Sequence, residues 1–203
     1  MALDPRLRRP AGAARCLSAL VQLGAKPDDP NVKRGLAYLL GEQMDEGSWY
    51  GRWGANYIYG TWSTMCALNA AGLSHAHPAI RKAVNWLISI QNEDGGWGED
   101  CDSYKLDYSG YEKAPSTASQ TAWAVMALMA GGDVAHPAVA RGVRYLTSTQ
   151  REHGLWDEEL FTGTGFPRVF YLRYHGYRKY FPLWALARYA RLRQSNERFT
   201  FGM

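Results

Sequence analysis

Four aromatic residues near the end of the sequence have a spacing that could bring their rings together. At intervals of 4, 4 and 3 residues stand Phe166, Phe170, Tyr174 and Tyr177. A helix starting near Pro167 would align them in one stripe, because residues three and four apart share a helix face. Aromatic faces attract positive charge, so the stripe could hold a cation in a cavity. Ordinary packing in a hydrophobic core is the other interpretation of such a stripe.

Other groups that could do chemistry are few. His77 and His136 each stand in an Ala-His-Pro sequence, where capping of a helix start explains them better than metal binding does. Cys101 lies next to Asp100, as in some zinc sites, but no His motif accompanies the pair. The three cysteines form no CxxC pair and are typical of reduced thiols in a cytosolic protein. We therefore expect no metal and no cofactor.

A repeated motif occupies most of the chain before the aromatic stripe. Its pattern is P-x3-[KR]-[GA]-x2-[YW]-L-x3-Q-x3-G-x-W, and the part from the basic residue onward covers residues 34–49, 82–97 and 141–156. In each copy a Gln precedes a Trp by six residues: Gln43 and Trp49, Gln91 and Trp97, Gln150 and Trp156. The Gln residues are 48 and 59 positions apart, and periods of this size are typical of stacked helical arrays.

Each repeat predicts two helices of different character. Pro is favoured at the first position of a helix, where its missing N–H has no partner to lose, and the residue before it can act as the cap. We expect amphipathic outer helices near residues 30–43, 78–91 and 137–150. More apolar inner helices are expected near residues 13–23, 57–71, 117–130 and 181–193. This alternation predicts one all-α domain over residues 1–203, an α/α barrel (toroid) or partial barrel.

The Gln and Trp of each repeat are interpreted as a structural staple. A Gln amide at the end of one helix can reach unsatisfied backbone groups at the start of a neighbouring helix. A Trp ring can then cover that amide and exclude water. We expect each of the three pairs to contact an adjacent inner helix.

Composition limits the classes of function. The chain has 203 residues, of which 46% are hydrophobic and 13% aromatic, enough for a real core. No apolar run reaches the roughly 18 residues of a membrane span, so any membrane contact should be peripheral. The net charge is +4, with basic residues concentrated after Arg168. A solvated helix face explains them better than a nucleic-acid site.

The motifs together resemble a known family. The Gln/Trp repeats are similar to the QW repeats of triterpene cyclases. Longer similarities are GSWYGRWGANYIYGTW, QNEDGGWGEDCDSY, STASQTAWAVMAL and TGTGFPRVFYLRYHGYRKYFPLWALARY. These segments resemble the C-terminal portion of a bacterial squalene–hopene cyclase. They cover nearly all of this chain, but only about the last third of a typical family member.

The resemblance implies cyclisation of squalene to hopene or hopanol through carbocations, in an aromatic cavity that excludes water. It implies that the stripe of Phe166, Phe170, Tyr174 and Tyr177 lines this cavity near the later cations. Trp53 and Tyr59 match another aromatic cluster, with Tyr59 close to where the reaction starts, although packing explains both equally well. Arg15 lies near the place where some relatives have a His that supports the initiating Asp. An Arg beside an acid would favour the ionised form of that acid, so the same role is not assigned to Arg15. A surface position is at least as consistent for it.

The partner implied by the resemblance is squalene or a related polyprene. The complete enzyme would be cytoplasmic with peripheral, monotopic membrane contact, and no nucleic acid would be involved. The product and the oligomeric state stay open.

One departure from the family pattern is decisive for activity. The family starts its reaction with an Asp-rich DxDD motif, and this sequence contains no DxDD. The chain is therefore expected to need the N-terminal cyclase region, as a fragment or one piece of a split enzyme would. Two alternatives stay open at this point: a non-catalytic helical scaffold or binding module, and a protein resembling a prenyltransferase β-subunit.

The absent acid gives a direct prediction. The purified chain, incubated with squalene, should form no hopene or hopanol, because the alkene has no strong acid from which to take its proton. Extraction and chromatography of the lipids measure the outcome. Any cyclised product would show that an acid within these residues can start the reaction.

Overall fold

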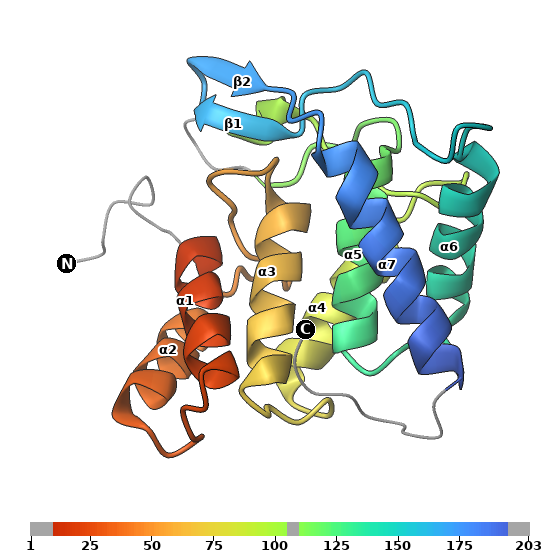
Figure 1. Ribbon diagram of the computed structural model, residues 1–203. Coiled ribbons are helices and arrows are strands. Elements are labelled where there is room, and N and C mark those ends of the chain that lie inside the picture. Colours follow the sequence, from red (N-terminus) through yellow and green to blue (C-terminus); the bar gives the residue numbers. More distant parts are fainter. Residues whose placement is uncertain (1–9, 105–109, 195–203) are drawn as a thin grey trace.

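The computed structural model describes residues 10–104 and 110–194, which form helices and one short hairpin (Figure 1). The helices are α1 (Pro10–Gln22), α2 (Pro30–Gly41), α3 (Tyr57–Ala70), α4 (Pro78–Ser89), α5 (Ala118–Ala130), α6 (Pro137–Thr149) and α7 (Tyr177–Gln194), with a 3-10 turn at Cys101–Tyr104. The strands are β1 (Gly163–Phe166) and β2 (Phe170–Leu172). The single domain expected over residues 1–203 stays a prediction, since residues 1–9, 105–109 and 195–203 lie outside the described part.

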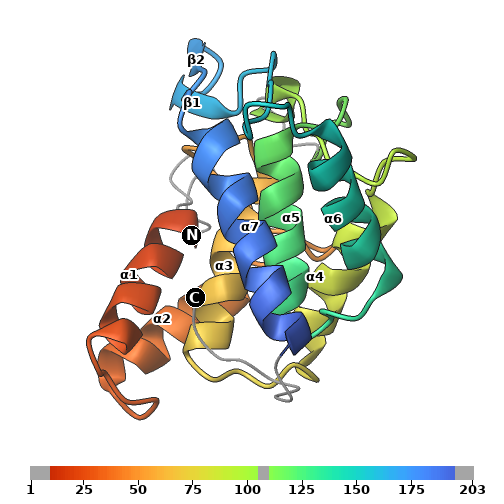
Figure 2. The same ribbon diagram turned by 45° about the vertical axis from the view of Figure 1, so that its right-hand side comes forward.

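The helices form two layers, as the repeat predicts. An inner row runs α1–α3–α5–α7, each helix packed on the next, while α2 packs on α1, α4 contacts α3 and α5, and α6 packs on α5 (Figure 2). Because α5 has neighbours on both sides, every one of its residues is buried. The alternation of inner and outer helices in a partial α/α toroid is therefore confirmed, with the hairpin as an addition.

The outer helices begin where the sequence indicates. Pro30, Pro78 and Pro137 each occupy the first turn. The side chains of Asp29, His77 and His136 accept hydrogen bonds from the backbone N–H two residues later, at 2.7, 3.2 and 3.1 Å. Capping by both histidines is thus confirmed, and each uses Nδ1 as the acceptor.

The last inner helix differs from its prediction. It begins at Tyr177, four residues before the expected start at residue 181. Only Phe181, Pro182 and Ala185 of α7 are buried, so the expectation that it is mostly buried is wrong. Its 18 residues include the basic side chains that make this segment polar, although one of them, Arg188, is partly buried near Cys66 of α3.

The helix expected from near Pro167 is also wrong. Strands β1 and β2 pair antiparallel with Phe166 opposite Phe170, and the chain turns between them. Arg168 in that turn has φ = 68°, a left-handed conformation that does not continue a helix. The interval of four residues between the two Phe therefore reflects a cross-strand pair rather than a helix turn.

Each Gln/Trp pair folds its own loop in the same way. The Gln side chain donates to the carbonyl of the Gly four residues later, at 2.9, 2.8 and 2.8 Å in the three copies. The indole N–H of Trp49, Trp97 and Trp156 donates to a Leu carbonyl in the preceding outer helix, at 2.6, 2.8 and 2.7 Å. The loop thus closes the carbonyl end of each outer helix, where four groups lack intrahelical partners.

All three copies also bond to an inner helix, as expected. The backbone N–H of Trp49 and of Trp97 donates to a Thr hydroxyl in α3 and in α5, each at 3.0 Å. In the third copy the Trp156 carbonyl accepts from the Arg178 guanidinium of α7 at 2.9 Å. The Gln amides of the first two copies reach the start of the next outer helix, so the staple links both layers.

None of the helices within residues 10–104 and 110–194 combines the length and the apolar composition that a membrane span requires.

Substitution of Trp97 in the second repeat tests how much the buried hydrogen bond of its indole N–H contributes to stability. Trp97→Phe should lower the free energy of unfolding by about 2–3 kcal/mol, because it leaves a cavity and an unpaired Leu87 carbonyl. Denaturant unfolding measures the change. Trp53→Phe is the control, because Trp53 is 47% exposed and should change stability by less than about 0.5 kcal/mol. Equal effects would contradict the staple.

Candidate functional site

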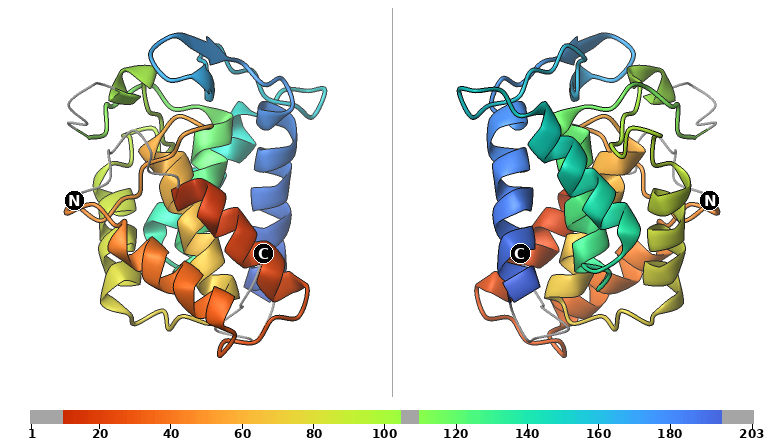
Figure 3. Two further views of the ribbon diagram at one scale, coloured as in Figure 1. Left: turned by 90° about the vertical axis from the view of Figure 1, so that its left-hand side faces the viewer. Right: turned by 90° about the vertical axis from the view of Figure 1, so that its right-hand side faces the viewer.

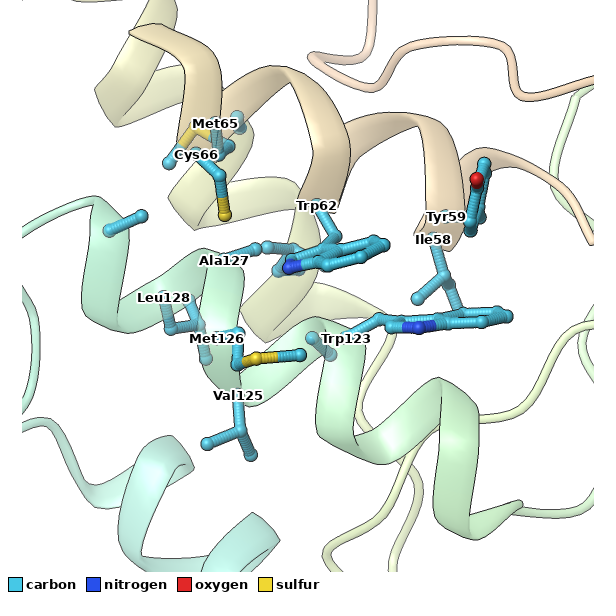
Figure 4. Close-up of a cluster of buried hydrophobic side chains, with 14 of the residues drawn as sticks. Ile58, Tyr59, Trp62, Met65, Cys66, Trp123, Val125, Met126, Ala127 and Leu128 are labelled. Carbon is cyan, nitrogen blue, oxygen red and sulfur yellow. The ribbon is translucent and has the colours of Figure 1, made fainter. Parts of the chain in front are cut away.

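A continuous cluster of aromatic rings crosses three inner helices. Trp62 of α3 and Trp123 of α5 stack with ring centroids 6.0 Å apart (Figure 4). Phe181 of α7 meets both edge-on, at 5.2 and 5.3 Å. Such offset and edge-to-face pairs stabilise beyond the burial of their area. The cluster therefore ties the inner row together by ring contacts alone.

Two tyrosines extend this cluster. Tyr59 lies 5.0 Å from Trp123 and 5.6 Å from Trp62, between ring centroids, and is only 4% exposed. Tyr177 lies 5.6 Å from Trp123, and burial raises the pKa of its hydroxyl. Two of the six residues expected to line a cavity, Tyr59 and Tyr177, thus lie in the aromatic cluster.

The sequence did not single out Trp62, Trp123 or Phe181. Trp62 and Trp123 lie inside predicted inner helices and Phe181 at the expected start of another, where a large apolar residue is interpreted as part of the core. The available signal was their position in three different inner helices that must face one another. Spacing along one helix could not reveal a cluster built across three.

Arg15 of α1 faces the rings. Its guanidinium donates to the Tyr59 hydroxyl at 2.8 Å and lies 5.6 and 5.5 Å from the centroids of Tyr59 and Trp62. A cation over aromatic faces is attracted by their quadrupoles. Arg15 is therefore a partner of the aromatic cluster rather than a purely surface residue.

The remaining aromatic residues of the predicted stripe lie on and beside the hairpin. Phe166, Phe170 and Tyr174 are 58%, 48% and 42% exposed. They form two close pairs instead of one stripe: Phe166 with Phe170 at 6.0 Å, and Tyr174 with Tyr177 at 4.8 Å between centroids. Since Tyr177 also touches Trp123, the exposed rings continue into the buried cluster at the end of the row where α3, α5 and α7 begin (Figure 1).

Two glycines in the TGTG sequence make room for these rings. A Cβ on Gly165 would lie 1.9 Å from the Phe170 ring, and one on Gly163 would lie 2.4 Å from the Tyr174 ring. No larger residue fits without displacing the aromatic side chain. The glycines of this motif thus have a steric function that its sequence alone did not indicate.

Trp53 lies beside the hairpin through its backbone. Its carbonyl accepts from the N–H of Thr164 in β1 at 3.0 Å. The ring is 47% exposed, with the Arg52 guanidinium 5.1 Å from its centroid. Trp53 thus differs from the buried Tyr59 in exposure, although the next residue, Gly54, packs against the Tyr59 ring.

Buried carboxylates hold the starts of the inner helices. Glu99 accepts from the N–H groups of Tyr57 and Ile58 at the start of α3, each at 2.9 Å. Glu158 does the same at α5, accepting from the N–H of Ser119 at 2.9 Å. Helix N-termini favour negative charge. Both carboxylates stand two residues after the Trp of a repeat.

Burial raises the pKa of both acids, to about 7 for Glu99, although the helix N–H groups act in the opposite direction. The Glu99 oxygens accept from the N–H groups at the start of α3, and those of Glu158 accept from Ser119 of α5. Both carboxylates therefore position helices.

Within the described ranges, no three His, Cys, Asp or Glu side chains gather as a metal site requires. Cys101 donates to the carbonyl of Phe161 at 3.3 Å, and burial raises the pKa of its thiol to about 12. A metal ligand would have to be the thiolate. The prenyltransferase-like zinc site is thus not supported.

A small pocket opens next to the aromatic cluster. Its volume is about 210 Å³, and Arg15, Trp62, Cys66 and Trp184 contribute to its lining. Burial raises the pKa of Cys66 to about 12, so its thiol adds no charge to the lining, to which Arg15 contributes a guanidinium. Ligand pockets usually measure ~300–1,000 Å³. The pocket by itself is therefore too small to enclose a large ligand.

Comparisons with known proteins agree on one family. Residues 6–191 match the squalene-hopene cyclase C-terminal domain. The squalene–hopene cyclase of Bradyrhizobium diazoefficiens is 68% identical over 186 residues, which cover 91% of this chain and 28% of that protein. The squalene–hopene cyclase of Zymomonas mobilis is 62% identical over 185 residues, again 91% of this chain and 28% of that protein. The chain thus spans about 28% of the length of these relatives.

A solved structure supports the fold. The type II terpene cyclase MstE from Scytonema, in complex with its product merosterolic acid A, superimposes with a TM-score of 0.59 at 20% identity. The match covers 86% of this chain and 52% of that one. At this identity the likeness concerns the arrangement of helices alone.

The carboxylate under α3 makes stability depend on pH. In the unfolded chain Glu99 releases its proton near its ordinary pKa of 4.5, but in the folded chain near 7. The unfolded state is therefore increasingly favoured as pH rises through this window. Relative to Glu99→Gln, which does not titrate, the original chain should lose on the order of 3 kcal/mol of unfolding free energy between these pH values.

Denaturant unfolding of both proteins from pH 4 to 8 checks this prediction. Taking the difference between the two cancels the titration of Glu158 and the other acids. A difference that stays constant with pH would show that the hydrogen bonds from α3 cancel the effect of burial on the Glu99 pKa.

Proposed function

Because this chain belongs to the squalene-hopene cyclase C-terminal domain family, we propose that it forms one wall of a cavity in which a polyprene such as squalene is cyclised. The observation that carries the proposal is the unbroken set of ring contacts from Tyr174 through Tyr177 and Trp123 to Tyr59. This set of rings is apolar and rich in aromatic faces, with Tyr174 at its exposed end and Trp123 and Tyr59 buried. Both properties suit a hydrocarbon that passes through cationic intermediates.

The chain's own residues would bind, shape and stabilise rather than initiate. A carbocation is quenched by water or by a nucleophilic side chain, so the wall must exclude both. Burial keeps the hydroxyl of Tyr177 and the thiol of Cys66 protonated, which lowers their nucleophilicity. The acid that protonates the first alkene would come from the cyclase region that this chain does not match.

The exposed rings of the hairpin fit the same proposal. Phe166 and Phe170 present large apolar surfaces that substrate or the remaining wall would cover in the complete enzyme. Gly165 keeps the Phe170 ring in place by leaving room for it. We assign these two rings to the part of the cavity where the later cations form. The Arg52 guanidinium already lies over the Trp53 ring. We therefore assign Trp53 a supporting role beside Phe166 and Phe170.

Peripheral membrane contact forms part of the proposal for the complete enzyme. Squalene is an apolar chain, so a lipid surface is the natural source from which a cyclase would take it. Val169 in the hairpin turn and Leu183 of α7 are apolar and exposed at 76% and 63%. Either residue could meet a lipid surface or the rest of the protein.

Substitution of Phe170 tests the assignment in a full-length protein. A chimera is made in which this chain replaces the matching 28% of the Bradyrhizobium diazoefficiens cyclase. Phe170→Leu should release partly cyclised products, whereas Phe170→Tyr should keep more of the normal product. Loss of a cation–π contact of about 1–2 kcal/mol would slow the affected step about tenfold or more. Product analysis after incubation with squalene gives the result.

Phe161 offers a matched control for exposure. It is 47% exposed, against 48% for Phe170, and the Arg173 guanidinium already lies 5.2 Å from its ring centroid. Phe161→Leu should leave the product distribution unchanged. If Phe170→Leu and Phe170→Tyr both give only the normal product at unchanged rates, the hairpin rings are packing residues and the proposal for them is wrong.

A further inference from the structure

Four tyrosines form a second set of ring contacts, which begins in the hairpin. Tyr171 of β2 stacks on Tyr104 of the 3-10 turn, with ring centroids 6.0 Å apart. Tyr50 meets Tyr104 edge-on at 5.9 Å, and it meets Tyr57, the first residue of α3, at 5.8 Å. In both views of Figure 3 the hairpin, the 3-10 turn and the loop before α3 lie at the same end of the molecule. This tyrosine row therefore links the hairpin to the start of an inner helix.

The hydroxyl of Tyr104 joins two segments that carry exposed rings. It donates to the Gly54 carbonyl at 2.7 Å and accepts from the Thr164 hydroxyl of β1 at 2.9 Å. Gly54 follows Trp53 directly, and Thr164 lies two residues before Phe166. Burial raises the pKa of Tyr104 well above its ordinary value, so the hydroxyl keeps the proton that it donates. One buried hydroxyl thus holds both segments in place.

The hydroxyl of Tyr171 holds the turn between the two strands. It accepts from the N–H of Arg168 at 3.1 Å and donates to the Cys101 carbonyl at 3.3 Å. Of the residues that the structure describes, Arg168 is the only one other than glycine with a positive φ, which is unfavourable for a residue with a Cβ. The hydrogen bond from Arg168 therefore helps to maintain the turn that brings Phe166 opposite Phe170.

An irregularity in β1 separates these polar contacts from the exposed rings. Thr164 pairs with Tyr171 and Phe166 pairs with Phe170, so Gly165 is an extra residue between the two pairs. Residues two apart in a regular strand point to the same face, but the extra residue of a bulge changes this alternation. Thr164 is accordingly 1% exposed, whereas Phe166 is 58% exposed. The hydroxyl contacts hold one face of the hairpin, and the two Phe rings stand on the other.

We propose that Tyr104 and Tyr171 are positioning residues of the cavity wall, whose hydroxyls fix the hairpin so that Phe166 and Phe170 present their rings to the substrate. This proposal rests on the proposed function, which assigns those two rings to the later cations. A cation–π contact weakens when the ring moves away from the cation. A cation without that contact would lose a proton, or take up water that then releases a proton, before the last ring closes. A loosened hairpin should therefore give partly cyclised products although both Phe rings are present.

General stabilisation of the fold is the alternative role for the two hydroxyls. Removing a buried hydrogen bond lowers the free energy of unfolding in either case, so stability alone does not distinguish the roles. The place that loosens does distinguish them. Easier global unfolding exposes all protected amides to exchange by the same factor, whereas local opening exposes only the amides of the segment that opens.

Amide hydrogen exchange of this chain, followed by NMR, separates the two roles. Tyr171→Phe keeps the ring and removes only the hydroxyl. The reporters are the Thr164 N–H, bonded to the Trp53 carbonyl, and the Val169 N–H, bonded to the Phe166 carbonyl, each at 3.0 Å. Exchange of both reporters should become about twofold to tenfold faster, the range expected for the loss of one or two neutral hydrogen bonds.

Two references show whether the effect is confined to the hairpin. The Gly131 N–H at the end of α5 should exchange at an unchanged rate in Tyr171→Phe. Tyr145→Phe removes a hydroxyl of α6 that donates to the Ser116 carbonyl at 2.8 Å, and it should leave both hairpin reporters unchanged. Equal acceleration at Gly131 and in the hairpin, or no acceleration in the hairpin, would overturn the proposal.

Substitution of Thr164 tests the Tyr104 hydroxyl through its partner. Thr164→Val keeps the branched shape but removes the hydroxyl that donates to Tyr104, whereas Thr164→Ser keeps a hydroxyl. In the full-length chimera with the Bradyrhizobium diazoefficiens enzyme, Thr164→Val and Tyr171→Phe should each raise the share of partly cyclised products by about twofold to tenfold. Thr164→Ser and Tyr145→Phe should give a product distribution close to that of the original chimera.

The outcomes distinguish this proposal from the proposed function. If Phe170→Leu changes the products but Tyr171→Phe and Thr164→Val do not, the hydroxyls do not position the rings and this proposal is wrong. If exchange becomes faster in the hairpin alone while none of the three substitutions changes the products, the hydroxyls do hold the hairpin. The assignment of its rings to the cavity, which belongs to the proposed function, is then wrong.

Discussion

The hydrogen bond from a Gln amide to the start of the next outer helix is the interaction on which the rest of this structure depends. The amide of Gln43 or Gln91 donates both to the Gly carbonyl of its own loop and to a first-turn carbonyl of the next outer helix, that of Ala79 or Ala138. Gln91 shows the full pattern, since its amide joins its own loop, the start of α6 and Arg141. A glycine without a Cβ is needed for that approach. The outer layer is thus joined by polar contacts of fixed length, which set the spacing of the repeats.

The same loops position the inner row. The backbone N–H of Trp97 is bonded to α5, and Glu99, two residues later, is bonded to the start of α3. One loop therefore orients two neighbouring inner helices, and Glu158 repeats the second contact at α5. The first repeat has Gly51 at this place and has no equivalent carboxylate. Because Trp62 and Trp123 stack between α3 and α5, the geometry of the aromatic cluster follows from these polar contacts.

The last inner helix, α7, has two sides of different character. Phe181 on one side of α7 packs in the aromatic cluster, while Leu183 remains exposed. Arg178 near the start of α7 donates to the Trp156 carbonyl at 2.9 Å, so the third repeat holds this helix as well. The small volume of the pocket beside Trp62 is consistent with a wall that needs an opposite side.

The sequence by itself determined the features that depend on local chemistry. Three features act within a few residues of one another: Pro at the first turn, the caps His77 and His136, and the fixed Gln-to-Trp interval. The sequence pattern was therefore enough to predict the helices and the repeat. The resemblance carried by these motifs indicated the family. Tertiary structure decided the rest. Phe166 and Phe170 form a cross-strand pair because the turn at Arg168 and the room left by Gly163 and Gly165 favour a hairpin. The spacing of the aromatic residues along the sequence carries no information on this preference. The aromatic cluster is built from three helices and contains Tyr59, Trp62, Trp123 and Phe181. Ring contacts between segments distant in the sequence produce no periodic pattern along the chain, so the sequence alone could not predict them.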